Sequence, residues 1–181
     1  MRIRRSTESD RSAIGDIHTN AFGREQGQEI SILVHDLLDD DTAKPLLSLV
    51  AETDGRLAGH ILFTKARLEP GIQQGSIRIL APLAVLTGLQ GAGIGGALIE
   101  EGMNQLAGAG VDLVFVLGHP GYYAKFGFQP AGILGFEAPY ALPAEHADAW
   151  MVQELKPVVI GRIRGRIQCS EVLNQPQHWR E

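Results

Sequence analysis

Cysteine is almost absent from the chain, since Cys169 is the only one among 181 residues. A single cysteine excludes a disulfide bond within the chain and argues against a metal site built from several cysteines. Cys169 closes an alternating, strand-like segment, where a small packed residue is its simplest interpretation. We predict no metal site.

Long apolar runs and an excess of positive charge are also missing. No run approaches the ~20 residues of a membrane-spanning helix, and the basic start, residues 1–5, is not followed by the apolar stretch of a secretory signal. The net charge of −5 lacks the basic excess of a general nucleic-acid binder. We therefore expect a cytoplasmic protein with neither a membrane nor a nucleic-acid partner.

Apolar residues are plentiful, at 44% of the chain, and they form no internal repeat or low-complexity tract. A chain of this length and composition can bury one substantial core but is too short to favour two domains. We predict one domain spanning residues 1–181.

The first part of the chain predicts a short strand and two helices. Residues 1–5 fit the strand, and Thr7 and Asp10 have the spacing of a capping box at a helix start. Apolar residues then recur at helical intervals until a polar and flexible stretch, Gly23 to Gln28. The second helix should follow, with an apolar stripe from Ile30 to Leu38.

A hairpin should come next. Thr53-Asp54-Gly55 separates the apolar runs Leu46 to Glu52 and Arg56 to Ala66, and Asp-Gly between such runs strongly favours a tight antiparallel turn. A turn at Gln73 to Gly75 leads into a strand from Ser76 to Val85. This strand contains Pro82, which cannot donate a backbone hydrogen bond and therefore predicts a bulge or an unpaired edge in a mixed sheet.

The remaining elements follow from the same patterns. They are a helix from Ile94 to Gly108, a buried strand from Val111 to Leu117, an irregular stretch from Pro130 to Pro143, and strands at Trp150 to Leu155 and Gly161 to Cys169. The last strand alternates Arg162, Arg164 and Arg166 with smaller residues, which favours a solvated outer face.

Closely spaced glycines interrupt the middle of the chain, between Leu83 and Ala97. The order is an apolar strand, a glycine loop and a helix. Backbone amides around glycines can turn toward a ligand, and the first turn of a helix adds unpaired N–H groups with roughly half a positive charge. Such a loop suits a pyrophosphate.

Two common phosphate-binding patterns fit this loop poorly. A nucleotide-binding P-loop needs Lys and then Ser or Thr after its last glycine, whereas Gly96 is followed by Ala97 and Leu98. The dinucleotide pattern G-x-G-x-x-G does occur here, with Asp112 at about the right distance beyond it. However, Asp112 stands at the near end of the next apolar strand, and the ribose-binding acid belongs at the far end.

A third pattern fits better. Residues 90–95 read Gln-Gly-Ala-Gly-Ile-Gly and resemble the loop that binds the CoA pyrophosphate in the GNAT superfamily of acyl-CoA-dependent N-acyltransferases. Residues 120–128, Pro-Gly-Tyr-Tyr-Ala-Lys-Phe-Gly-Phe, resemble that family's second signature, a short helix carrying a tyrosine and closed by Gly-Phe. The two motifs occur in the family's order over about residues 80–130, and their residues are most similar to those of the YhbS-like bacterial branch.

The resemblance implies a fold and a co-substrate. The implied fold is an α/β (α+β) domain with a mixed, mostly antiparallel twisted sheet flanked by helices. In it a central pair of strands splays apart, and the pantetheine arm of CoA fills the gap like an extra strand. Pro82 fits that opening, and the co-substrate would be acetyl-CoA without a metal.

The resemblance also implies the residues that bind CoA. Backbone groups of Leu83, Ala84 and Val85 would hold the pantetheine and polarise the thioester carbonyl, as an oxyanion hole does. The pyrophosphate would bind to the loop formed by Gln90, Gly91, Ala92, Gly93, Ile94, Gly95 and Gly96. A loop that only packs the helix against the sheet is the alternative.

Tyr123 is the predicted catalytic residue. It stands four residues before Gly127, where the family's proton-donating tyrosine falls, and a phenol with a pKa of ~10 suits a thiolate leaving group. Tyr122 is the neighbouring alternative. His119 would line the thioester site or accept the amine proton, or would be a simple turn residue.

The general base stays open at this point. Residues 76–86 contain no acidic side chain, although many proteins of the family carry one on the strand before the glycine loop. Glu52, His60, His119 or a chain of water molecules are the candidates.

The sequence thus predicts an N-acetyltransferase that moves an acetyl or other acyl group from acetyl-CoA to a primary amine in a ternary complex. The amine would belong to a small molecule, a peptide or a protein, chosen by the loops Phe22 to Gln28 and Pro130 to Pro143. A non-catalytic acyl-CoA-binding or sensing module is the competing class, and a nicotinamide-dependent oxidoreductase is a third. The C-terminal strands are candidates for a homodimer contact.

Overall fold

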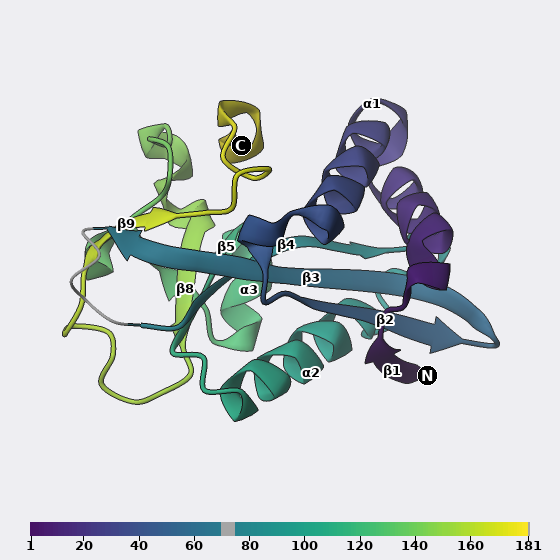
Figure 1. Cartoon of the computed structure of the whole chain (residues 1–181), viewed down its shortest axis with the longest axis horizontal. Coiled ribbons are helices and arrows are strands. Elements are labelled where there is room, and N and C mark those ends of the chain that lie inside the picture. The colour runs from purple at the N-terminus through teal and green to yellow at the C-terminus, as the bar shows by residue number, and fades with distance from the viewer. Residues whose placement is uncertain (70–74, 181) are drawn as a thin grey trace.

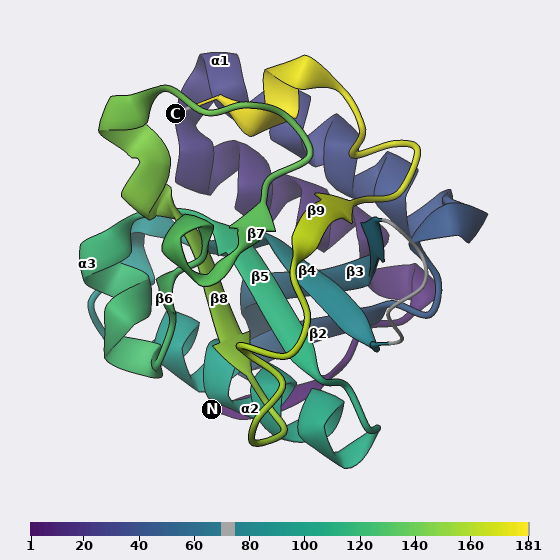
Figure 2. The same ribbon diagram turned by 90° about the vertical axis from the view of Figure 1, so that its left-hand side faces the viewer.

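A computed structural model describes residues 1–69 and 75–180, so most of the turn predicted at Gln73 to Gly75 lies outside the described residues. The main sheet has the strand order β1-β2-β3-β4-β5-β8-β6 (Figures 1 and 2). Its strands are β1 Arg2–Arg5, β2 Leu47–Thr53, β3 Arg56–Glu69, β4 Ile77–Val85, β5 Leu113–Leu117, β8 Trp150–Glu154 and β6 Gln129–Pro130. Two further short strands, β7 Phe136–Glu137 and β9 Gly165–Gln168, pair beside the far end of β3.

Helices cover both faces of the sheet (Figure 1). The long helix α1, Arg11–Asp39, lies over one face together with the C-terminal segment, and α2, Ile94–Gly108, lies on the opposite face. The short helix α3, Pro120–Tyr123, follows β5 directly. Because β4 and β5 are parallel while the other neighbours in the main sheet are antiparallel, the sheet is mixed, and the predicted fold class is confirmed.

The hairpin between β2 and β3 forms as predicted. Asp54 and Gly55 have backbone φ angles of 51° and 75°, which are the left-handed values that a tight type I′ turn requires at its two central positions. Thr53 pairs with Arg56 at its end. The alternating side chains of the hairpin then bury one set of residues against α1 and the other against α2.

Helix α1 departs from the prediction after Gly23. The backbone breaks at Gly23, with φ 84° and ψ 178°, which confirms the predicted division into two helices, but the second helix begins at once, so the prediction of a flexible stretch from Gly23 to Gln28 was wrong. The two halves of α1 pack against each other through Gly27, where an added Cβ would collide with the carbonyl oxygen of Thr19. This close contact stabilises helical backbone in a segment whose polar side chains indicated a loop.

The central strands β4 and β5 diverge half-way along β4. Their parallel pairing runs from Ile77 opposite Leu113 to Leu80 opposite Val116 and is described no further. On its other side β4 stays paired with β3 as far as Val85, across a register shift opposite Pro82 that is the predicted bulge. Residues 81–85 therefore present one paired and one open backbone edge, and the expected splay is confirmed.

The last strand is shorter than predicted. Instead of Gly161 to Cys169, β9 covers only Gly165–Gln168, because residues 157–164 form turns that include left-handed backbone at Val158 and Gly161. Arg162 and Arg164 therefore precede the strand, although their side chains are exposed as expected. The segment beyond β9 folds back toward α1 and ends in a short 3₁₀ helix, Pro176–Trp179.

Candidate active site

A cavity of about 560 Å³ opens where β4 and β5 diverge. Its inner wall is residues 80–83 of β4, together with the end of β5 and the two residues that follow it, residues 116–119. Side chains of α1 between Phe22 and Leu33 form the facing wall, and the C-terminal segment, residues 173–180, closes one side. The gap in the sheet is therefore also the place where a small molecule fits.

Three of the predicted site residues meet in this cavity, namely Leu83, His119 and Tyr123. His119 is the residue before α3, and its carbonyl oxygen accepts the backbone N–H groups of both Tyr122 and Tyr123. The Tyr123 ring is only 9% exposed and lies edge-on to Phe128, with ring centres 5.7 Å apart. The turn after β5 thus delivers a phenol and an imidazole to the open edge of β4.

The glycine loop lies beside this cavity and does not line it. Gly91 and Gly93 have φ angles of 82° and 85°, are exposed, and have no atom within 4 Å of the place where a side chain would begin. A left-handed backbone in open space at the start of α2 leaves amides free to face a ligand. The side-chain amide of Gln90 donates to the carbonyl oxygen of Val85 at 3.0 Å and so ties the loop to the end of β4.

The last two glycines of the loop have a different surrounding. An added Cβ at Gly95 would lie 2.6 Å from the hydroxyl oxygen of Tyr122, and one at Gly96 would lie 2.9 Å from the ring of Phe126. Both positions are already helical and carry no left-handed backbone. Their lack of a side chain lets the aromatic segment after β5 pack directly on the first turn of α2.

A comparison with protein families decides what this arrangement is. Residues 2–131, more than half of the chain, match the model of the acetyltransferase (GNAT) domain. The chain belongs to the GNAT acetyltransferase family. This membership overturns the nicotinamide-dependent alternative.

Individual GNAT relatives agree with the family match. The uncharacterized N-acetyltransferase YjhQ of Escherichia coli is 43% identical over 167 residues, covering 91% of this chain and 89% of its own. The solved structure of the GNAT N-acetyltransferase YhbS from Escherichia coli in complex with CoA has a TM-score of 0.85 at 26% identity, over 96% and 92% of the two chains. A GNAT acetyltransferase from Brucella melitensis, solved with acetyl-CoA, gives 0.73 at 31% identity, over 95% and 97%.

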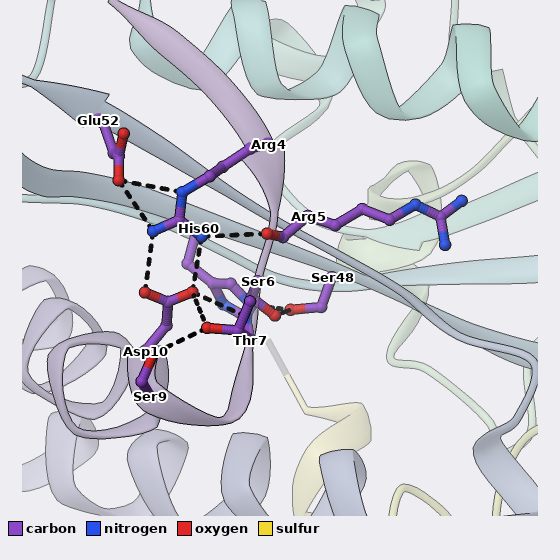
Figure 3. A network of polar contacts seen from close by, with 9 residues as sticks. All are labelled: Arg4, Arg5, Ser6, Thr7, Ser9, Asp10, Ser48, Glu52 and His60. Atoms are coloured by element: carbon purple, nitrogen blue, oxygen red, sulfur yellow. Dashed lines mark hydrogen bonds and ion pairs between the residues drawn. The ribbon is translucent and has the colours of Figure 1, made fainter.

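Two of the candidate bases of this GNAT chain lie away from the cavity. Glu52 accepts hydrogen bonds from Arg4 Nε at 3.0 Å and Nη2 at 2.8 Å, at the β1 edge of the sheet (Figure 3). His60, on β3, is fully buried. Its Nε2 lies 2.8 Å from Ser48 Oγ and its Nδ1 lies 2.8 Å from His18 Nε2. Of the three side chains proposed as the base, namely Glu52, His60 and His119, His119 alone lines the cavity.

The GNAT cavity also has walls that the sequence did not indicate. Glu29 lines it from the second half of α1, and His178 and Arg180 line it from the C-terminal segment. The stretch from Pro130 to Pro143, expected to shape the acceptor site, does not line it, whereas Phe22 and Gln26 of the other expected loop do. No motif marks Glu29, since it is one of several polar residues on an amphipathic helix, and the C-terminal segment lies beyond the family match.

Within residues 1–69 and 75–180, no three His, Cys, Asp or Glu side chains are grouped so that they could hold a metal ion. The same residues include no helix that is long and apolar enough to span a membrane.

Proposed function

We propose that the chain transfers an acetyl or other acyl group from acetyl-CoA to a primary amine by direct attack in a ternary complex. One observation carries the proposal. The open backbone edge of β4, the phenol of Tyr123 and a cavity of about 560 Å³ occur together at the splay, beside the glycine loop. The volume falls within the range of small-molecule sites, roughly 300–1,000 Å³.

The residues present fit CoA in two places. Gly91 and Gly93 hold left-handed backbone in open space at the start of α2, so the amides of residues 91–96 can face a pyrophosphate. Leu83, Ala84 and Val85 are paired with β3 on one side, and the other edge of this segment, apart from the Val85 carbonyl oxygen that accepts the Gln90 amide, can hydrogen-bond the pantetheine arm. These backbone groups are also suited to polarise the thioester carbonyl oxygen, because they are held by the sheet before the substrate binds.

Tyr123 is proposed as the proton donor. Its ring is in contact with Gly118, Tyr122 and Phe128, which restrict its movement, and the residue lines the cavity. A neutral phenol can give its proton to the departing thiolate as the thioester bond breaks. His119 lies in the same cavity and is placed to contact the substrates there.

Glu29 is proposed as the group that holds the amine and accepts its proton, directly or through one water molecule. It lines the cavity on the α1 side, and its negative charge raises the pKa of His178 against the larger lowering effect of burial. A carboxylate attracts an ammonium group and can take its proton before attack. This residue supplies the acid that residues 76–86 lack.

The acceptor remains a primary amine of a small molecule, a peptide or a protein. We also propose that the protein is cytoplasmic and forms a homodimer through its C-terminal strands. The competing function is a module that binds or senses acyl-CoA without transferring the acyl group.

The decisive experiment follows free thiol release from acetyl-CoA over a broad panel of primary amines, with the amine omitted as the control. We expect thiol release that depends on one class of amine and a matching acetylated product by mass spectrometry. Tight binding of CoA with neither transfer nor hydrolysis on any amine would instead favour the binding or sensing module.

A further inference from the structure

The hydroxyl of Tyr122 lies against the first turn of α2. An added Cβ at Gly95 would be 2.6 Å from this oxygen, 3.7 Å from Val85 Cγ2 and 3.8 Å from Leu83 Cδ2. The hydroxyl therefore stands where the first turn of α2 meets the open edge of β4. Its ring is fixed by Tyr123 and Phe126, with ring centres 5.1 Å and 5.2 Å away.

The Tyr122 hydroxyl makes no hydrogen bond within residues 1–69 and 75–180. The Gly95 Cβ position that it approaches also lies near side-chain carbons of Leu83 and Val85, which cannot accept a hydrogen bond. The free groups at a helix start are N–H donors, so they cannot accept the phenolic proton either. Burial raises the pKa of Tyr122, which keeps the phenol protonated at neutral pH. The phenol can therefore donate to an anion that binds at the helix start.

We propose that the Tyr122 hydroxyl donates a hydrogen bond to the pyrophosphate of CoA and completes the anion site formed by the amides of the glycine loop. The proposal rests on the proposed function, because it assumes that CoA binds at this loop. The two adjacent tyrosines then have separate tasks. Tyr122 binds the co-substrate, and Tyr123 protonates the leaving group.

The packing around Gly95 follows from the same arrangement. A residue with a Cβ at this position would push the phenol away from the helix start, whereas glycine lets the oxygen approach the free amides. Glycine at position 95 thus serves the position of the Tyr122 hydroxyl, and it does not supply the left-handed backbone found at Gly91 and Gly93.

The first test compares Tyr122→Phe with Tyr123→Phe by calorimetry and steady-state kinetics. Tyr122→Phe keeps the ring and should raise the dissociation constant of CoA about tenfold, the lower end for a hydrogen bond to a charged group. Its KM for acetyl-CoA should rise in parallel, while turnover at saturation falls far less. Tyr123→Phe should instead lower turnover strongly while the dissociation constant of CoA and the KM for acetyl-CoA stay near those of the wild type.

The same variants assayed with S-acetylpantetheine identify the part of CoA that is contacted. This probe lacks the pyrophosphate, so Tyr122→Phe and the wild type should use it with equal KM. An equal loss with both donors, or unchanged CoA affinity in Tyr122→Phe, would overturn the inference while leaving the proposed function intact. A wild-type protein that does not bind CoA would overturn both.

A second test locates the hydroxyl without any ligand. Gly95→Ala should lower the melting temperature because its methyl group meets the phenolic oxygen, and adding Tyr122→Phe should restore part of the loss because that oxygen is gone. Strictly additive changes in melting temperature would show that the hydroxyl does not lie against Gly95, and the assigned contact would be wrong.

Discussion

At the scale of single residues, the position of Tyr123 leads to a separation of binding from chemistry. Tyr123→Phe keeps the ring that packs against Phe128 and removes only the hydroxyl. Turnover should fall by about 10²- to 10⁴-fold, the usual effect of removing a positioned acid, with CoA affinity near that of the wild type. Stopped-flow thiol release and calorimetry measure the two quantities, and near-normal turnover on the true amine would assign the proton to another donor or to solvent.

A second residue-scale feature is the buried pair His18 and His60. Burial lowers the pKa of His18 from 6.5 to about 4, and burial together with the charge of His18 lowers the pKa of His60 well below 6.5. Between pH 6.5 and pH 4 the unfolded chain therefore binds more protons than the folded one. The stabilising effect is fully present above pH ~6.5 and is lost as the pH falls through this window, by on the order of 2 kcal/mol.

Urea unfolding at pH 7, 5.5 and 4.5 measures this dependence. His60→Gln keeps a side chain that can hydrogen-bond but does not titrate, so its free energy of unfolding should fall less between pH 7 and pH 4.5. Asp10, whose pKa the Arg4 ion pair lowers from 3.8, loses its stabilising effect only as the pH falls below 3.8, so it contributes little between pH 7 and pH 4.5. If the free energy of unfolding fell equally with pH in the variant and the wild type, the pair of histidines would not be the source of the pH dependence.

At the scale of elements, the glycine loop makes a prediction about ligand-induced stability. A ligand that binds only the folded state stabilises it by RT ln(1 + [L]/Kd), about 2.7 kcal/mol at a hundredfold excess over Kd. Gly93→Asp should abolish the shift in melting temperature caused by CoA, because it places a negative charge where the phosphates are expected. Aspartate tolerates left-handed backbone better than most residues, so the variant should still fold.

Gly88→Asp is the matched control for this experiment. Position 88 precedes the loop, has open space around it and no left-handed backbone, and receives the same charge. Its CoA-induced shift should stay close to that of the wild type. A full shift in Gly93→Asp would contradict the pyrophosphate assignment.

The elements also show which features are predictable from the sequence. The Asp54-Gly55 hairpin, the bulge at Pro82 and the end of α2 depend on local backbone preferences, so the residues themselves indicate them. The continuation of α1 beyond Gly23 depends on the contact between Gly27 and Thr19, eight positions apart, which no local pattern records. The shortened β9 likewise depends on turns whose residues alternate as a strand would.

At the scale of the whole molecule, the cavity is assembled from distant parts of the chain. Tyr123 belongs to a recognised motif and Leu83 to the strand before the glycine loop, whereas Glu29 and His178 come from a helix and a terminal segment without a motif. The positions of the β4 edge, the glycine loop and α3 were therefore predictable from the sequence, since the motifs beside them are short and local, and CoA binding by these elements stays a prediction. The acceptor side was not predictable, because it exists only after α1 and the C-terminal segment pack together.

This assembly predicts a variant that affects the acceptor alone. Trp179 anchors the C-terminal segment, since it is buried against Trp150 and donates a hydrogen bond to the carbonyl oxygen of Leu173 at 3.0 Å. Trp179→Ala removes about 3 kcal/mol of packing and should release the segment. The KM for the amine should rise at least tenfold while the CoA-induced shift in melting temperature persists. Loss of the CoA-induced shift together with amine binding would mean that the segment supports the whole fold.

The open edge of β4 has a consequence for the protein in a growing cell. A sheet whose missing strand is supplied by a metabolite is more stable when that metabolite is abundant. On the proposal that CoA fills the gap, starvation for its precursors would leave more molecules transiently unfolded and accessible to proteases, so the protein would be degraded faster. The gap between β4 and β5 would then set the lifetime of the protein by the nutritional state of the cell.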